Sequence, residues 1–394
     1  MRVRLLDLSQ QYHTLSQEIR AATDEVFSSQ RFILGPKLAE FEKAVAEYCR
    51  VPHAIGVSSG TDALLASLMA LEIGLGDAVI TTAYSFFATG GCIARVGATP
   101  VFIDIEPGTH NISAAALRRY IQKYCHKVEN KLVNENQQTI VALIPVHIFG
   151  LCCDMREMLA IAREHNLILI EDAAQAIGAE FSLKNGPAKA GTMGGVGCFS
   201  FYPSKNLGAA GDAGLVVCHN TDFAERLRRC RNHGMGAQYR HDFVGGNFRL
   251  DEIQAAILKV KLPHLDAWSA ARREAADFYT NEFRRAGLDK KIKLPVPPSG
   301  ESGLKNDHIY HQYVIRSPRR DDLRSHLAGR EIETAIYYPL ALHEQPCFEY
   351  LGYKAGDFPE AERAARENLA LPIYPEISRE AQQYVVNCIA DFFS

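Results

Sequence analysis

Between about residue 53 and residue 219, short apolar runs alternate with stretches of helical periodicity, and few folds accommodate this alternation. Several of the runs are apolar throughout, which is typical of strands covered by helices on both faces. The predicted strands are His53–Val57, Ala78–Thr82, Pro100–Ile105, Thr139–His147, Leu167–Glu171, Val196–Phe201 and Gly214–His219. We therefore predict an α/β fold with a large, doubly wound, mostly parallel sheet.

The two ends of the chain have a different pattern. Two helices are predicted first, because apolar residues recur at helical spacing at Leu15, Ile19, Ala22 and Val26, and then at Leu38, Phe41, Val45 and Tyr48. Long helices are expected from Arg249 to Arg285, with an interruption near Pro263. Beyond them we predict a strand (Ile309–Arg316), a helix (Asp321–Ala328), a strand (Glu333–Tyr338) and further helices. The expected domains are residues 1–265 and a smaller α/β domain over 266–394.

Composition argues against several classes of protein. The net charge is only −3 and no basic or acidic tail is present, so nucleic acids and anionic membranes are not expected as partners. The N-terminus has no sustained apolar run, and no stretch has the apolar length of a membrane helix. The ten cysteines form no CxxC pair. We expect a cytoplasmic protein with reduced thiols and no metal site.

Two charged residues follow predicted strands. Lys205 lies in a polar turn, and Gly208, Gly211 and Gly214 behind it allow the backbone to approach another group closely. Asp172 directly follows an apolar strand, where open α/β sheets bind ligands. Each residue alone has an ordinary explanation, as a solvated lysine or a helix N-cap. The functional interpretation is that Asp172 pairs with a protonated pyridine nitrogen, which keeps the ring electron-withdrawing.

A polar turn and an aromatic residue extend this site. Ser58–Thr61 opens a helix, whose free N–H groups favour a phosphate, and Ser200 and Ser204 can add hydroxyl donors. Phe86 can stack on a flat ring, although a core role is the commoner one for phenylalanine. Gln175, three residues beyond the aspartate, can reach a ring oxygen. The order of phosphate turn, aromatic, aspartate and lysine is that of an aminotransferase that uses pyridoxal 5′-phosphate (PLP).

A series of segments over nearly the whole chain carries a resemblance to a known family. The segments are FILGPKLAEFE, SSGTDAL, YSFFAT, PVHIFG, EDAAQA, FSFYPSKNLGAAGDAG, RNHG, GGNFRLDEIQAA, YHQYVIR, TAIYYPLALHEQ and LALPIYPEI. In content and order the chain resembles the DegT/DnrJ/EryC1/StrS family of PLP-dependent nucleotide-sugar aminotransferases. The resemblance implies the aspartate aminotransferase-like fold, fold type I of the PLP-dependent transferases. It also implies a homodimer with active sites at the interface.

The resemblance implies a role for each candidate residue. Lys205 matches the lysine that forms the Schiff base, and Asp172 matches the partner of the pyridine nitrogen. The remaining cofactor matches are Gln175 at the ring oxygen, Phe86 on the ring, Gly60, Thr61 and Ser200 at the phosphate, and Asn247 at the phosphate of the neighbouring subunit. The expected sugar-nucleotide contacts are Arg249, Tyr337 and His343.

The resemblance also ranks the substrates. L-Glutamate is the expected amino donor, and Lys205 is expected to carry the proton between the donor Cα and the cofactor C4′. The segment TAIYYPLALHEQPCFEYLGY most resembles the subgroup that acts on 3-keto sugars. We therefore expect a UDP-linked 2-acetamido-3-keto sugar as acceptor, with a 3-amino sugar and 2-oxoglutarate as products. A dTDP-linked 3-keto-6-deoxyhexose and a 4-keto sugar are the alternatives.

Three other functions are weighed against this one. Sugar dehydratases of the same fold carry histidine in place of the lysine, so Lys205 argues against them. An amino-acid aminotransferase needs an arginine clamp for two carboxylates, which Arg316 or Arg330 could provide. A non-catalytic regulatory protein on the same fold is the alternative of another class, and the intact lysine, aspartate and phosphate turn argue against it.

Some features have no assigned role. The polar stretches Cys125–Gln138 and Pro297–Asn306 resemble insertions that could shape the substrate mouth, form oligomer contacts or be neutral. His147 lies in an apolar strand and is expected to be a satisfied core histidine. Whether His311 faces the site is left open, and His233 of RNHG is a candidate only through its place in the resemblance.

Overall fold

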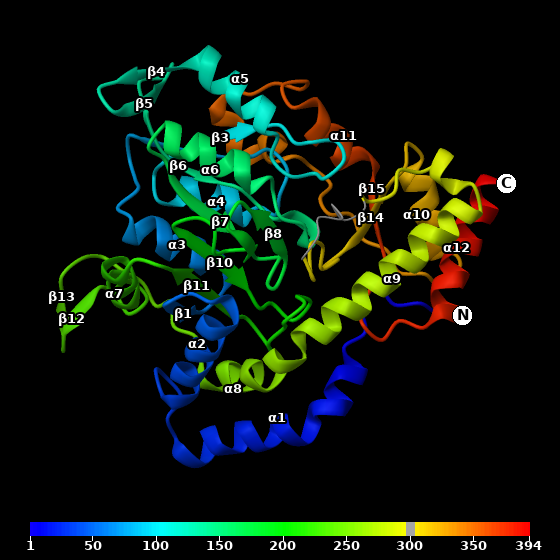
Figure 1. Ribbon diagram of the computed structural model, residues 1–394, viewed down its shortest axis with the longest axis horizontal. Helices are drawn as coiled ribbons and strands as arrows, with labels where there is room; N and C mark the ends of the chain where they lie inside the picture. The colour runs from blue at the N-terminus through cyan, green and yellow to red at the C-terminus, as the bar shows by residue number, and fades with distance from the viewer. Residues whose placement is uncertain (297–303) are drawn as a thin grey trace.

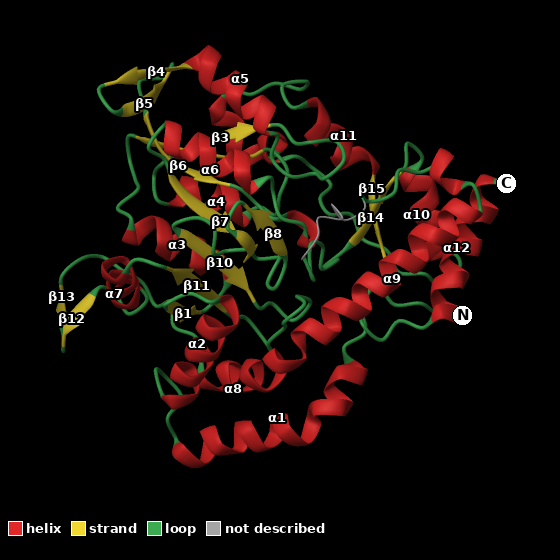
Figure 2. Ribbon diagram, viewed as in Figure 1, coloured by secondary structure: helices red, strands yellow, loops and turns green. Residues whose placement is uncertain are grey.

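A nine-stranded sheet with helices on both faces is the centre of the computed structural model, which describes residues 1–296 and 304–394 (Figures 1 and 2). All seven predicted strands are present, as β1 (His53–Val57), β2 (Asp77–Thr82), β3 (Thr99–Ile103), β6 (Thr139–Ile144), β7 (Ile168–Asp172), β10 (Val196–Ser200) and β11 (Gly214–Cys218). They are ordered β1-β11-β10-β7-β6-β2-β3. β11 is antiparallel to both of its neighbours, and the other pairs along this path are parallel. The prediction of a mostly parallel sheet is confirmed.

Helices cover both faces of the sheet, because successive apolar residues of a strand point to opposite faces and both sets must be buried. In β11, Leu215 and Val217 pack into a core with α2 and α8, whereas Val216 packs with α3 and α7. The helices of this part of the chain are α1 (Ser9–Ser29), α2 (Pro36–Cys49), α3 (Gly60–Ala70), α4 (Ala88–Arg95), α5 (Ala114–Tyr124), α6 (Met155–Glu164), α7 (Thr221–Cys230), α8 (Glu252–Lys261) and α9 (Leu265–Arg285). A 3-10 turn at Leu262–His264 separates α8 from α9, so the predicted interruption at Pro263 is confirmed.

Three hairpins project from this framework. The polar stretch Cys125–Gln138 forms β4 (Cys125–Val128) and β5 (Lys131–Asn134), and β5 adds to the sheet beside β6. The other two hairpins are β8 (Glu180–Leu183) with β9 (Gly186–Lys189), and β12 (Met235–Ala237) with β13 (Arg240–His241). Of the second polar stretch, residues 297–303 lie outside the described part of the chain. Its end is held where the backbone N–H of Lys305 donates to Glu180 at 2.7 Å.

The C-terminal part builds a second core around a two-stranded sheet. Its elements are β14 (Tyr313–Arg316), α10 (Arg320–Ala328), α11 (Pro359–Glu367), β15 (Asn368–Leu371) and α12 (Arg379–Phe393). The predicted strand Glu333–Tyr338 is wrong, because β15 pairs with β14 and the earlier segment contributes only a bridge from Ala335 to Ala370. The chain's beginning also belongs to this core, since buried Val3 pairs with Ile332.

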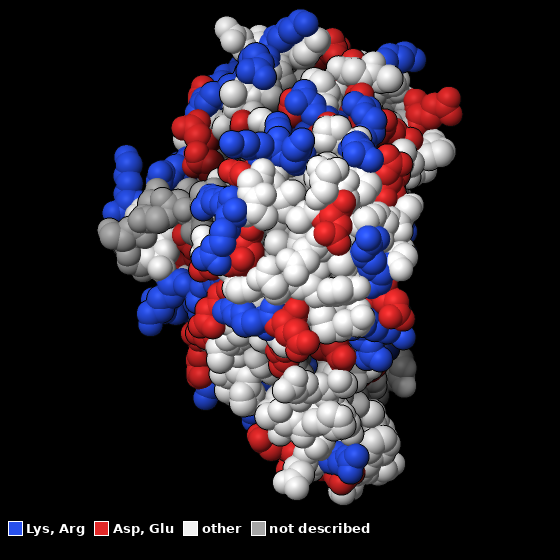
Figure 3. Space-filling model, turned by 90° about the vertical axis from the view of Figure 1, so that its right-hand side faces the viewer, with Lys and Arg blue, Asp and Glu red and all other residues white. Residues whose placement is uncertain are grey.

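The surface shows no large patch of one charge on the face seen in Figure 3. Lysine and arginine side chains alternate there with aspartate and glutamate, with uncharged surface between them. This agrees with the nearly balanced net charge of −3. Within the described residues, no helix has the length and apolarity needed to cross a membrane.

Candidate active site

A cavity of about 510 Å³ lies at the carboxyl ends of β1, β7 and β10, where ligands bind in open α/β sheets. It brings together eight of the eleven residues to which the family resemblance gives a role, and Ser204, the other predicted hydroxyl donor, also lines it. The eight are Gly60, Thr61, Phe86, Asp172, Gln175, Ser200, Lys205 and Tyr337. They come from segments that are far apart in the chain, so the sheet topology is what assembles the site.

Lys205 lies in a tight turn after β10. Its backbone N–H donates to the carbonyl oxygen of Tyr202 at 2.8 Å, and the N–H of Ala209 donates to the carbonyl oxygen of Phe201 at 2.8 Å. Gly208 permits this turn, because a Cβ there would lie 2.3 Å from the carbonyl oxygen of Pro203. Burial lowers the pKa of the Lys205 amine to about 8, and the charge of Asp172 partly opposes this effect. At pH 7 about one tenth of the amine is therefore neutral and nucleophilic, far more than for an ordinary lysine with a pKa of 10.5.

Asp172, at the end of β7, is only 5% exposed. The hydroxyl of Thr89 donates to its Oδ2 at 2.8 Å, and the N–H of Ala174 donates to its Oδ1 at 3.2 Å. Burial raises the pKa of Asp172, whereas these two hydrogen bonds and the charge of Lys205 lower it. The carboxylate is thus held in one orientation with acceptor capacity left toward the cavity.

Glu171, the residue before Asp172, fixes the end of β7 through its hydrogen bonds. Glu171 is fully buried and accepts from the Nε2 of His147 at 2.8 Å. The N–H of Cys153 donates to Nδ1 of the same imidazole at 3.1 Å, so Nδ1 is unprotonated. Nε2 therefore carries the N–H that donates the hydrogen bond to Glu171. His147 is the satisfied core histidine that was expected.

The first turn of α3 presents free N–H groups to the cavity. The Ser59 hydroxyl caps the helix by accepting from the N–H of Asp62 at 3.0 Å, which leaves the N–H groups of Gly60 and Thr61 without a partner inside the helix. A Cβ on Gly60 would lie 2.6 Å from the Cβ of Ser200, so the glycine lets α3 and the end of β10 meet. This turn is suited to an anion such as a phosphate.

Aromatic residues form a further part of the cavity wall. Phe86 is 55% exposed on the cavity side and its ring lies 6.0 Å from that of Tyr338. The Gln175 amide donates to the Tyr338 hydroxyl at 2.9 Å and accepts from the N–H of Phe149 at 2.6 Å. Buried Tyr84 ties this wall to the end of β2, since its hydroxyl donates to the carbonyl oxygen of Tyr337 at 2.6 Å. The exposed face of Phe86 is available for stacking on a flat ring.

Three predicted contacts do not line this cavity. Asn247 is exposed and pairs with Asn232, and Arg249 donates to the Asn232 side chain at 2.7 Å. His343 is buried, with Nε2 at 3.3 Å from Glu362 and its ring 4.7 Å from that of Phe358. The roles of these residues in binding the neighbouring cofactor or the sugar stay predictions.

Several residues that line the cavity, or that contact a residue lining it, were not recognised from the sequence. Thr89 follows Phe86 by three residues, which is one helical turn, and this spacing could have suggested a shared location. His311, whose direction was left open, lines the cavity with Nδ1 at 3.1 Å from the Asn206 side chain. Gln312 and Tyr338 also line it, and no local pattern marks them.

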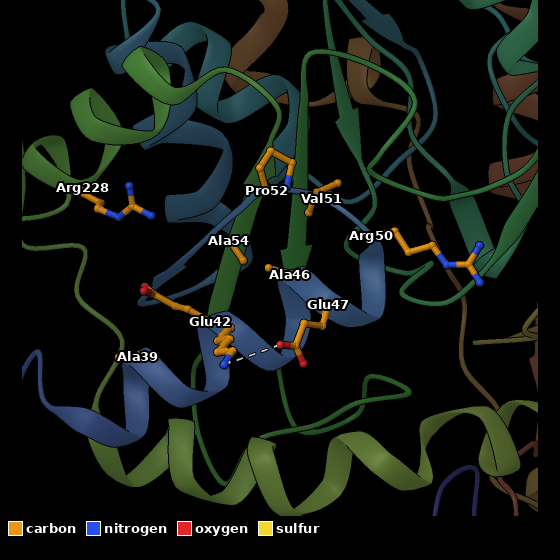
Figure 4. Close-up of a pocket in the computed structure, with 10 residues that line it drawn as sticks. Ala39, Glu42, Ala46, Glu47, Arg50, Val51, Pro52, Ala54 and Arg228 are labelled. Atoms are coloured by element: carbon orange, nitrogen blue, oxygen red, sulfur yellow. Dashed lines mark ion pairs between the residues drawn. The ribbon is translucent and has the colours of Figure 1, made fainter.

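A second hollow, of about 480 Å³, lies on the surface beside α2. Figure 4 shows Arg50 and Arg228 on opposite sides of it, so they do not converge on one point. Lys43 and Glu47 form an exposed ion pair across 3.9 Å. None of the predicted site residues lies here. In the described part of the chain, no three His, Cys, Asp or Glu side chains are grouped so as to hold a metal ion.

The family of the chain follows from comparison with known proteins. The model of the DegT/DnrJ/EryC1/StrS aminotransferase family matches residues 13–390. The chain belongs to this family. This confirms the expectation that the chain is a PLP-dependent aminotransferase with the fold described above.

Similar proteins cover nearly all of the chain. A pleiotropic regulatory protein of Geobacillus stearothermophilus is 47% identical, over 100% of this chain and 99% of its own length. A UDP-N-acetyl-3-dehydro-α-D-glucosamine 3-aminotransferase of Acidithiobacillus ferrooxidans is 39% identical, over 96% and 94%. The crystal structure of S. venezuelae DesV in complex with a ketimine intermediate is 38% identical, with a TM-score of 0.88 over 99% of this chain and 98% of DesV.

The residues of the cavity fit PLP. Lys205 provides an amine whose lowered pKa suits attack on an aldehyde, and Asp172 provides a buried carboxylate for a pyridinium nitrogen. The α3 turn supplies N–H donors for a phosphate, and Gly60 and Gly214 leave room there, since a Cβ on Gly214 would lie 2.2 Å from the Ser59 carbonyl oxygen. Phe86 supplies an exposed ring face.

Proposed function

We propose that the protein transfers the amino group of L-glutamate to a nucleotide-linked keto sugar, with a UDP-linked 2-acetamido-3-keto sugar as the acceptor. The products are a 3-amino sugar and 2-oxoglutarate. The observation that carries the proposal is the convergence of Lys205, Asp172 and the free turn of α3 on one cavity. The similarity to a UDP-N-acetyl-3-dehydro-α-D-glucosamine 3-aminotransferase supports the choice of sugar.

The two charged residues divide the chemistry. PLP, when bound, supplies an electron sink for the carbanion at the substrate carbon. With PLP bound, the Lys205 amine would act as the base that takes the proton from Cα of glutamate, and it would supply a proton to the sugar carbon in the second half-reaction. Asp172 keeps the ring nitrogen protonated through both half-reactions, which is why its carboxylate must stay oriented and charged.

The remaining residues position the cofactor. Gly60, Thr61 and Ser200 would hold the phosphate, Phe86 would stack on the ring, and Gln175 would lie beside the ring oxygen; all five line the cavity. On this proposal Tyr337 contacts the sugar nucleotide from the cavity wall, whereas His343 is buried beside Glu362 and does not line this cavity.

A second copy of the chain completes the site on this proposal. Asn247 and Arg249 do not line the cavity of their own chain, and Asn247 is exposed on the segment beside the β12–β13 hairpin. Tyr239 and Val244, in and beside this hairpin, are 86% and 85% exposed, which is unusual for large apolar side chains. A homodimer in which Asn247 reaches the phosphate of the neighbouring subunit, and Arg249 its sugar nucleotide, accounts for both observations.

An amino-acid aminotransferase is less well supported. Neither arginine considered for a carboxylate clamp lines the cavity, since buried Arg316 pairs with Glu367 at 2.9 Å and Arg330 lies beside His326 at 3.2 Å. A non-catalytic regulator is favoured only by the name of the 47% identical relative, because the lysine, the aspartate and the phosphate turn are all intact.

The test is an absorption spectrum of the purified protein with PLP, recorded before and after L-glutamate and then with UDP- and dTDP-linked keto sugars. We expect glutamate to bleach the cofactor band near the visible edge and the UDP-linked 3-keto sugar to restore it. Restoration only by a dTDP-linked 3-keto-6-deoxyhexose or a 4-keto sugar would replace the proposed acceptor. A band that glutamate leaves unchanged would favour the regulator.

A further inference from the structure

A buried arginine without a carboxylate partner lies behind the active-site cavity. Arg272, on α9, is 2% exposed. Its Nη1 donates to three backbone carbonyl oxygens, those of Tyr310 at 3.2 Å, His311 at 3.2 Å and Ile373 at 3.1 Å. Among the described residues no group accepts a hydrogen bond from Nε, which is buried, or from Nη2. One edge of the guanidinium is therefore satisfied and the other is not.

A buried guanidinium of this kind is stabilised by a nearby anion. Removing a guanidinium from water is costly unless an opposite charge offsets the loss. Glu376 acts on Arg272 from beyond ion-pair distance, and its own Oε2 is buried without a partner in the described part of the chain. Burial lowers the pKa of Arg272 to about 10, and Glu376 opposes this only in part. The chain itself thus leaves the charge incompletely compensated.

Arg272 faces a small hollow that adjoins the active site. The hollow has a volume of about 40 Å³, and Ser204, His311, Gln312 and Tyr337 line both it and the larger cavity. Its volume is of the order of one water molecule or one carboxylate group, since a water occupies about 30 Å³ in the liquid.

We propose that this hollow receives a carboxylate of the amino donor, held by the free edge of Arg272. The inference rests on the proposed function, in which L-glutamate is that donor. The planar fork of a guanidinium matches a carboxylate, and the bond is charge-assisted. His311 lines both this hollow, which Arg272 also lines, and the larger cavity, which Lys205 lines, so the anchor and the reacting amine adjoin a shared wall. No arginine lines the larger cavity in the described part of the chain, so the hollow supplies the cation that the donor needs.

The probe is glutarate, a dicarboxylate that has no amino group to transfer, titrated calorimetrically into the holoenzyme. We expect Arg272→Met to weaken glutarate binding about 10- to 100-fold, as the loss of a charge-assisted hydrogen bond would. The KM for L-glutamate should rise by the same factor. Amination of the keto sugar by enzyme loaded with pyridoxamine phosphate should change by less than about 2-fold, and Arg272→Lys should recover part of the glutarate affinity.

A second variant separates this role from a structural one, because Nη1 also holds three carbonyl oxygens. Ala370, 1% exposed, lines the hollow, so Ala370→Val fills it while leaving the guanidinium in place. The same selective loss of glutarate binding is expected. Unchanged glutarate affinity in both variants, or equal losses in both half-reactions with a lower melting temperature, would overturn the assignment. Rejection of every keto sugar by the wild-type enzyme would instead refute the proposed function, and glutarate binding would still be measurable.

Discussion

The hydroxyl of Thr89 donates a hydrogen bond of 2.8 Å to Oδ2 of Asp172, and both side chains are buried. Thr89 comes from the start of α4 and Asp172 from the end of β7, so the bond joins two elements at the sheet edge. Ser85 adds a further hydroxyl 3.1 Å from that of Thr89. The Thr89 hydrogen bond opposes only in part the burial that raises the pKa of Asp172.

Replacing Thr89 with Val should weaken PLP binding, because the nearly isosteric side chain removes the donor and lets the pKa of Asp172 rise. We expect an affinity loss of about 10-fold, the scale of one hydrogen bond to a charged group. Thr89→Ser keeps the hydroxyl and should stay close to wild type. Titration of the apoenzyme with PLP, followed by absorption, measures the affinity; equal affinities for the Val and Ser variants would refute the role of the hydroxyl.

The pH dependence of PLP uptake should report the lowered pKa of Lys205. Only the neutral amine attacks the cofactor aldehyde, so the association rate should rise with pH and level off above about 8. An unperturbed lysine would keep rising toward 10.5. Because the charge of Asp172 raises this pKa, Asp172→Asn should move the midpoint to lower pH. Stopped-flow mixing of apoenzyme and PLP across pH 6 to 10 provides the curve, and a midpoint that rises in the variant contradicts the account.

Gly60 should not tolerate a side chain. A Cβ there would lie 2.6 Å from the Cβ of Ser200, so Gly60→Ala must push α3 away from β10 and displace the phosphate turn. We expect a loss of stability of about 1–3 kcal/mol and a clear loss of PLP affinity. Gly329→Ala is the matched control, because Gly329 has a helical φ of −62° and its nearest contact would be 3.5 Å away. Chemical denaturation and PLP titration of both variants give the comparison.

Glu171→Gln should be strongly destabilising. One carboxylate oxygen accepts from the N–H groups of Met193 and Gly194, and the other from Gly191 and His147, at 2.6–2.8 Å. An amide must place an NH₂ group against two of these donors, whichever way it is turned. We expect the free energy of unfolding to fall by about 2–4 kcal/mol.

The surface change Glu47→Gln is the control for Glu171→Gln. Glu47 lies at 3.9 Å from exposed Lys43, and such pairs contribute less than about 1 kcal/mol. Urea denaturation should therefore separate the two variants clearly. Similar midpoints for both would show that the buried carboxylate is dispensable.

The sheet could be predicted from the sequence because its strands are continuous apolar runs, which local patterns reveal. The strand expected at Glu333–Tyr338 failed for a long-range reason. Only one segment can pair with β14 along this edge, and in the structure that segment is Asn368–Leu371. The strand propensity of a segment carries no information about which of two segments pairs with β14 in the folded chain.

The candidate site divides in the same way. Asp172 is the last residue of β7 and Lys205 lies in the turn that follows β10, so their position at the sheet edge follows from the alternation alone. Thr89, Gln312 and Arg272 matter only through neighbours that are distant in the chain. The Asp172 carboxylate lies 83 positions beyond Thr89, and the carbonyl of Ile373 lies 101 beyond Arg272. Spacing in the sequence does not report such contacts.

The central claim is that Lys205 carries PLP, and its most direct test is reduction of the holoenzyme with borohydride, followed by proteolysis and mass spectrometry. Reduction makes the bond between lysine and cofactor permanent, so the modified residue can be read from the peptide. We predict one phosphopyridoxyl group per chain, on the peptide that contains Lys205, and none in Lys205→Ala. A modified peptide with any other lysine, or no modified peptide after incubation with PLP, would contradict the account.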